Sequence, residues 1–158
     1  MVNCVRRTII MSVKLTDAEA RKLLEMTKRS LLKELHLPEK DHASKEFKVE
    51  GETKKDLFII RIFRGNIRSN KFNIGARIKV NDILLLELHI NPTAVHQNPD
   101  GEKITTSHWH IYTEQYGRAY AVSAEDIESD DFVDNTIMFL NKFNVIEQPK
   151  ITYQINFK

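Results

Sequence analysis

Residues 71–91 read KFNIGARIKVNDILLLELHIN, and this stretch decides the fold. Over 71–80, apolar residues or alanine occupy the even positions, while charged residues, asparagine and glycine occupy the odd ones. A period of two is typical of a strand that buries one face. Asn81-Asp82 is a turn signal, and the apolar run that follows predicts a second strand over 83–91. The stretch therefore predicts two successive strands of a sheet.

Working outward, a capping box at Thr16–Glu19 predicts a helix whose apolar stripe continues to Leu35, before Pro38 ends it. A second helix is predicted from Asp131 to Phe143, with acidic residues at its start. Further strands are predicted at 47–49, 57–63 (buried on both faces), 104–113, 118–123 and 151–157. The expected fold is α+β, an antiparallel sheet of about five to seven strands with two helices packed on one face.

The length of 158 residues fits a single domain, which we expect to span 12–158. Residues 1–11 are interpreted as an N-terminal extension, with either Met1 or Met11 as the start. The single cysteine, Cys4, excludes an intramolecular disulfide and indicates a reducing compartment, the bacterial cytoplasm. No apolar run approaches the ~18 residues of a membrane span, so no membrane partner is expected.

Four of the six histidines fall between residues 89 and 110. His108 and His110 are two positions apart on a predicted strand and therefore share a face. If the leucines of 84–90 pack on the same side as Trp109, His89 must lie on the face of His108 and His110. His96 lies in the connecting loop, which the turn Asn98-Pro99-Asp100-Gly101 returns toward the sheet.

This arrangement predicts one divalent metal ion, zinc, bound by His108 and His110 with His89 or His96 completing the set. Glu87 or Asp100 would serve as a carboxylate ligand or would orient a histidine. Two other interpretations stay open: metal-free catalytic histidines, or a purely structural polar face of the strand.

Basic residues are concentrated between positions 61 and 79, a segment without aspartate or glutamate. We expect them to contact an anionic partner, either nucleic acid or an acidic protein surface, or else to form a solvated face. Residues 125–134 are acidic by contrast. Acidic residues are typical of the start of a helix, or they would mimic the phosphates of a nucleic acid toward a basic partner. The predicted contact residues are Arg61, Arg64, Arg68, Lys71, Arg77 and Lys79.

The chain has no Walker loop, no glycine-rich dinucleotide motif and no G-x-S-x-G element, so no nucleotide cofactor is expected. His96, the Asn98–Gly101 turn, the run HWHIY at 108–112 and Tyr116-Gly117 together resemble an uncharacterised family of small proteins from bacterial genomes and prophages. The resemblance covers 72–157 and implies a setting of mobile elements and host–phage conflict, without implying an activity.

Three functions are consistent with these features. The favoured one is an inhibitor of a host or defence nucleoprotein, of anti-CRISPR type, with a structural zinc ion. The second is an endonuclease acting on RNA, with His108 or His110 as acid or base and Arg64 or Arg77 stabilising the transition state. The third is a non-enzymatic nucleic-acid-binding module, which would leave the histidines without a role.

Overall fold

The computed structural model describes residues 14–154. The predicted N-terminal extension 1–11 and the end of the predicted strand 151–157 lie outside the described residues. Within 14–154, neither helix has the length and apolar character needed to cross a membrane.

An eight-stranded sheet forms the body of the protein, in the order β10-β9-β6-β5-β4-β3-β1-β11. All neighbouring pairs are antiparallel except β1 with β11, which confirms an α+β fold with a mostly antiparallel sheet. The sheet exceeds the predicted five to seven strands because the short strands β1 and β11 extend one edge. Its strands are β1 (Lys28–Ser30), β3 (Ala43–Glu50), β4 (Leu57–Arg64), β5 (Phe72–Ile78), β6 (Leu84–Ile90), β9 (His108–Ile111), β10 (Ala121–Ser123) and β11 (Val145–Glu147).

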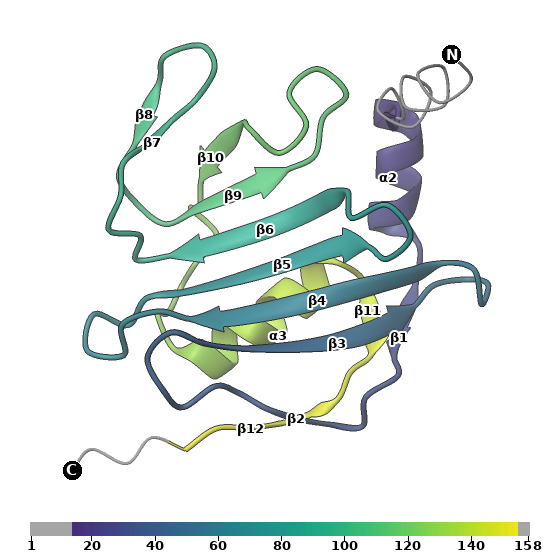
Figure 1. Cartoon of the computed structure of the whole chain (residues 1–158), viewed down its shortest axis with the longest axis horizontal. Helices are drawn as coiled ribbons and strands as arrows, with labels where there is room; N and C mark the ends of the chain where they lie inside the picture. The colour runs from purple at the N-terminus through teal and green to yellow at the C-terminus, as the bar shows by residue number, and fades with distance from the viewer. Residues whose placement is uncertain (1–13, 155–158) are drawn as a thin grey trace, which may run out of the picture.

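Two smaller strand pairs complete the secondary structure of the described residues. β2 (Glu34–His36) pairs in parallel with β12 (Lys150–Thr152), which begins the predicted last strand. β7 (His96–Gln97) and β8 (Lys103–Ile104) form a hairpin that projects beyond β9 at the top of Figure 1.

One face of the sheet is covered by helix α3 (Phe132–Lys142), which lies behind the strands in Figure 1. The Trp109 ring of β9 stacks on Phe139 of this helix, with 6.1 Å between ring centroids. On β4, Phe58, Ile60 and Ile62 are fully buried toward this side, while the intervening residues are half-buried or exposed. The prediction that 57–63 is buried on both faces is therefore wrong. The other face is open, and we call it the open face.

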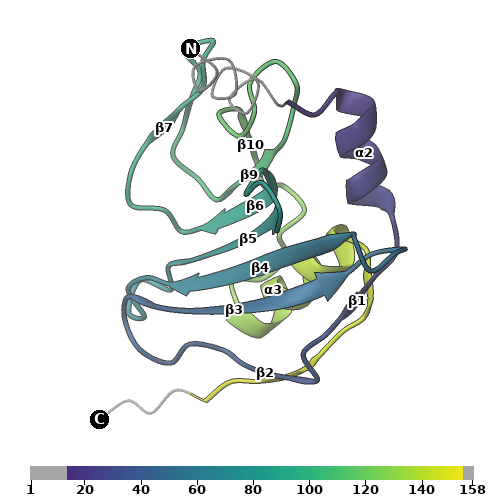
Figure 2. The same cartoon turned by 45° about the vertical axis from the view of Figure 1, so that its right-hand side comes forward.

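Helix α2 (Asp17–Glu25) begins with the predicted capping box: Glu19 N donates to Thr16 Oγ1 at 3.1 Å, and Thr16 N donates to Glu19 Oε1 at 3.3 Å. α2 ends at Glu25, whereas the predicted helix carried its apolar stripe to Leu35, which lies in β2 instead. Leu35 is completely buried there, so strand pairing and core burial override the helical spacing of the leucines. In Figures 1 and 2, α2 stands at the ends of the strands, where it contacts β6. That both helices pack on one face of the sheet stays a prediction.

The Asp131 side chain caps α3 by accepting a hydrogen bond from Asp134 N at 2.9 Å. We expect Asp131→Ala to lower the free energy of unfolding by about 1 kcal/mol, because it leaves a helix N–H without its acceptor. Denaturant unfolding measures this loss, and Asp130→Ala, at an exposed neighbouring position, is the matched control. Equal stability of the two variants would contradict the capping role.

Candidate metal centre

The pairing of β6 with β9 places the histidines on the open face. Leu88 lies opposite Trp109 on the covered face, while His89 lies opposite His108 and Glu87 opposite His110. This is the register predicted from hydrophobic matching, and it is confirmed. A slip of one residue would have moved His89 to the covered face.

The three rings lie close together. The ring centroids of His89 and His108 are 4.9 Å apart, and each is 5.0 Å from that of His110. One ligand nitrogen from each of the three histidines lies within 4.8 Å of the other two. Zinc bonds of ~2.1 Å in tetrahedral geometry require nitrogens about 3.4 Å apart, a distance that small side-chain rotations reach. The three histidines therefore have the chemistry and spacing of a metal centre.

One nitrogen of each ring is already held by a protein acceptor. His108 Nδ1 donates to the Thr106 carbonyl at 2.8 Å, and His110 Nδ1 donates to the Arg118 carbonyl at 2.7 Å. The Nε2 atom of His89 is hydrogen-bonded to the Glu87 carboxylate. Such outer partners fix the tautomer and ring orientation of metal-binding histidines. As far as residues 14–154 are concerned, they leave Nε2 of His108, Nε2 of His110 and Nδ1 of His89 without a hydrogen-bond partner.

Burial favours the neutral imidazole, the form that binds metals, at His108 and His110. Burial lowers the pKa of His110 to about 4, and burial also lowers the pKa of His108. Burial alone would raise the pKa of Glu87, but its hydrogen bond to His89 and the nearby charges of His89 and Arg118 lower it below its usual value. An ionised Glu87 is a strong acceptor for the His89 N–H.

His96 forms a wall of the same site, as the predicted return of its loop implied. Its ring centroid lies 4.8 Å from that of His110 and 5.5 Å from that of His108. Its Nε2 atom contacts Asn98 Oδ1 at 2.9 Å and the Ala119 carbonyl at 3.1 Å. It is not among the three histidines whose ligand nitrogens converge.

The return of the loop depends on Asn98, which is 2% exposed. Its side chain pairs with the backbone of Ala121 in β10, donating to the carbonyl at 2.8 Å and accepting from the amide at 2.7 Å. The carboxylate of Asp100 accepts from Tyr120 Oη and Glu102 N. Of the two predicted carboxylates, Glu87 therefore orients His89, whereas Asp100 accepts hydrogen bonds within the turn.

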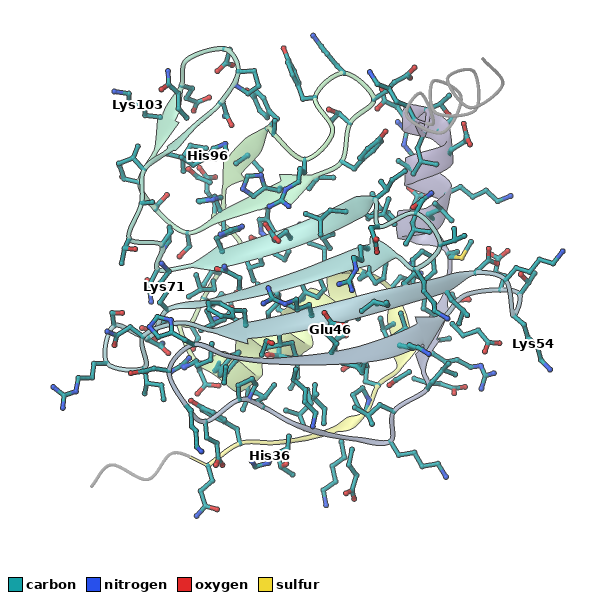
Figure 3. All side chains as sticks on the ribbon, in the orientation of Figure 1. His36, Glu46, Lys54, Lys71, His96 and Lys103 are labelled. Carbon is teal, nitrogen blue, oxygen red and sulfur yellow. The ribbon has the colours of Figure 1, made fainter. Side chains whose placement is uncertain are left out.

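The four histidines line a cavity of about 560 Å³ on the open face. Lys71, Asn73 and Arg118 also line it, and none of its lining residues in the described part of the chain is acidic. Figure 3 shows Lys71 and His96 at the same end of the strands. Sequence reasoning missed Asn73, although its odd position in the alternating stretch indicates the histidine face. Nothing in the sequence singled out Arg118, which the loop after β9 brings in.

A second cavity of about 200 Å³ adjoins the first and shares Asn73 and Arg118 with it. Arg61 and Arg77 line this second cavity, where Arg77 pairs with Asp82 at 3.2 Å and with Glu46 at 3.4 Å. Figure 3 shows Glu46 in the middle of the open face.

The remaining residues of the predicted basic surface are dispersed. Arg64 is 1% exposed on the covered face, and its guanidinium lies 4.7 Å from the Phe132 ring centroid of α3. The predictions that Arg64 contacts an anionic partner and acts beside the histidines in catalysis are therefore wrong. Even and odd residues of β4 point to opposite faces, and Arg64 lies at one of the buried even positions. Arg68 is exposed in the loop after β4, and Lys79 is exposed beyond the opposite end of β5 from Lys71.

Residues 15–145 match the sequence profile of a family of unknown function (DUF6978). The match agrees with the predicted resemblance to an uncharacterised family, while an origin in prophages stays a prediction. No curated protein and no solved structure matches the chain.

Proposed function

The chain belongs to this family of unknown function, DUF6978, and we propose that it is a metal-dependent hydrolase. His89, His108 and His110 would bind one divalent cation, zinc in the first instance. The observation that carries the proposal is the convergence of three rings, each with one nitrogen held by a protein acceptor and the other free.

The position of the site favours catalysis over a purely structural role. Structural zinc sites are closed by four protein ligands, whereas catalytic sites use three and keep a position for water. Here three histidines converge at a cavity of about 560 Å³, and the fourth, His96, is tied to Asn98 and Ala119. A zinc ion with one open position lowers the pKa of bound water to about 7, which supplies hydroxide at neutral pH.

The first test is metal stoichiometry. Protein freed of metal by chelation is expected to bind one equivalent of zinc, measured by calorimetric titration and elemental analysis. Its thermal midpoint is expected to rise with zinc concentration, because the ion binds only the folded state. Failure to bind zinc, cobalt or manganese at one equivalent would refute the proposal.

A metal-independent ribonuclease is the second candidate, because the histidine cavity and the arginine cavity share Asn73 and Arg118. His108 or His110 would act as acid or base, and Arg77 would face the substrate from the second cavity. Chelation separates the candidates, since a metal-independent enzyme keeps its activity without zinc and a zinc hydrolase loses it.

The inhibitor of a host or defence nucleoprotein and the nucleic-acid-binding module remain proposals. Both depend on a continuous basic surface, which the burial of Arg64 and the ion pairs of Arg77 reduce. Arg61, Lys71, Arg77 and Arg118 line the two cavities and are basic residues that would serve such a partner.

A further inference from the structure

We infer that the substrate of this site is a phosphodiester, bound by Lys71 and Arg118 beside the metal centre. The inference rests on the proposed function, because it names the substrate of the same site. It is carried by the charge of the cavity, by one buried acceptor without a donor, and by the adjoining second cavity.

The cavity is cationic before any metal binds. Lys71 and Arg118 line it, and no aspartate or glutamate within 14–154 does. Among residues 14–154, Lys71 Nζ bonds only to the hydroxyl of Thr93, at 2.9 Å, and has no carboxylate partner. Arg118 reaches Glu87 at 3.3 Å, but its side chain is 64% exposed and Glu87 also holds His89. Two cations and a divalent ion around one cavity select an anionic group with several oxygens.

Asn73 supplies the second observation. Among residues 14–154, its buried Oδ1 atom has no hydrogen-bond partner, and the residue lies directly opposite His89 across β5 and β6. A buried acceptor without a donor is destabilising, and because Asn73 lies in the cavity wall, a ligand that carries an O–H group would satisfy this atom once the side chain turns toward the cavity. A metal-bound water beside His89 is such a donor, and Asn73 would orient it toward the phosphorus.

The second cavity distinguishes a diester from a free phosphate. It shares Asn73 and Arg118 with the first, and Arg61, Phe63 and Arg77 line it together with Asp82 and Glu87. The Arg61 guanidinium lies 5.2 Å from the Phe63 ring centroid, which makes a flat surface suited to an aromatic or sugar group. A phosphate at Arg118 would therefore place one substituent in each cavity.

The reaction consumes one water. A zinc ion held by the three histidines would lower the pKa of a bound water, whose oxygen would form the new bond to phosphorus while the bond from phosphorus to the leaving oxygen breaks. The leaving oxygen takes up the proton that the water released on binding, so the products are a phosphate monoester and an alcohol.

The test uses the zinc-loaded full chain and bis(4-nitrophenyl) phosphate, whose hydrolysis releases a coloured phenol. Arg118→Gln and Lys71→Gln are each expected to lower kcat/KM at least about tenfold, since each removes a charge-assisted contact to the phosphate. Lys54→Gln is the control, because Lys54 is exposed at the opposite end of the strands in Figure 3. Zinc affinity is measured separately and is expected to stay unchanged in Lys71→Gln and Lys54→Gln, and each rate is compared at saturating zinc.

The outcomes of this test distinguish the metal centre from the identity of its substrate. If the wild type binds zinc and hydrolyses the neutral ester 4-nitrophenyl acetate but not the diester, the metal centre stands and the phosphodiester is refuted. Equal diester rates for Arg118→Gln, Lys71→Gln and Lys54→Gln refute it as well. Single-stranded RNA and DNA oligonucleotides form the last arm: a nucleic acid source predicts that Arg61→Gln lowers turnover of the oligonucleotide, and a small diester source predicts no turnover of it.

Discussion

Replacing His110 by alanine is expected to lower zinc affinity at least about a hundredfold. The substitution removes one of three ligands, whereas loss of an outer partner of a ligand typically costs ten- to a hundredfold. Calorimetric titration of the chelated protein measures the change. Glu87→Gln, which keeps the shape of the His89 partner and removes its charge, is expected to lie between the wild type and His110→Ala.

The control must remove a histidine without disturbing the backbone. His36 is suitable, because it lies in β2, with its side chain 55% exposed and hydrogen-bonded to Thr152 and Glu39. His42 is less suitable, since its φ of 56° adds strain to most replacements. Zinc affinity of His36→Gln is expected to equal that of the wild type. A comparable loss in His36→Gln, or full affinity in His110→Ala, would place the metal elsewhere.

The site could be predicted from the sequence because its geometry depends on alternation. Leu88 and Trp109 had to share the covered face, and a period of two then fixed His89 opposite His108. The partners of the rings could not be predicted in this way. The Arg118 carbonyl, which accepts from His110, and the Asn98 Oδ1 atom, which contacts His96, are positioned by loops whose path depends on contacts that no local period encodes.

The failures of prediction have the same origin. The leucines after Glu25 keep a helical spacing, but Leu35 is buried in a strand that pairs with residues near the end of the chain. Arg64 follows the alternation of β4 onto the covered face, although a basic residue at the end of a strand is usually exposed. Tertiary burial decides both cases, and it depends on residues distant in sequence.

Lys28→Met is expected to lower the free energy of unfolding by about 3 kcal/mol, because Lys28 holds the ends of both helices. Its ammonium, on a side chain that is 1% exposed, donates to the carbonyls of Leu24 at 3.1 Å, Met26 at 2.9 Å and Phe143 at 2.8 Å. Met26 is the C-cap of α2 and Phe143 that of α3. Methionine fills the same space but leaves these carbonyls without a donor.

The same residue gives the stability a distinctive pH dependence. Burial lowers the pKa of Lys28 from 10.5 to about 7, so between these two values the unfolded chain binds a proton that the folded chain has released. The free energy of unfolding therefore rises with pH across this window, by at most about 1.4 kcal/mol per pH unit. Below pH 7 the folded state bears the full cost of burying the charged side chain.

Denaturant unfolding at pH 6, 8 and 9.5 tests both effects, with Lys22→Met, at an exposed position of α2, as the control. The wild type and Lys22→Met are expected to gain stability across the series, whereas Lys28→Met should lose that gain and should fall furthest below the wild type at pH 9.5. If Lys28→Met follows the wild type with pH, the proton is not released from Lys28. If its stability equals that of the wild type, the two helix ends do not depend on this ammonium.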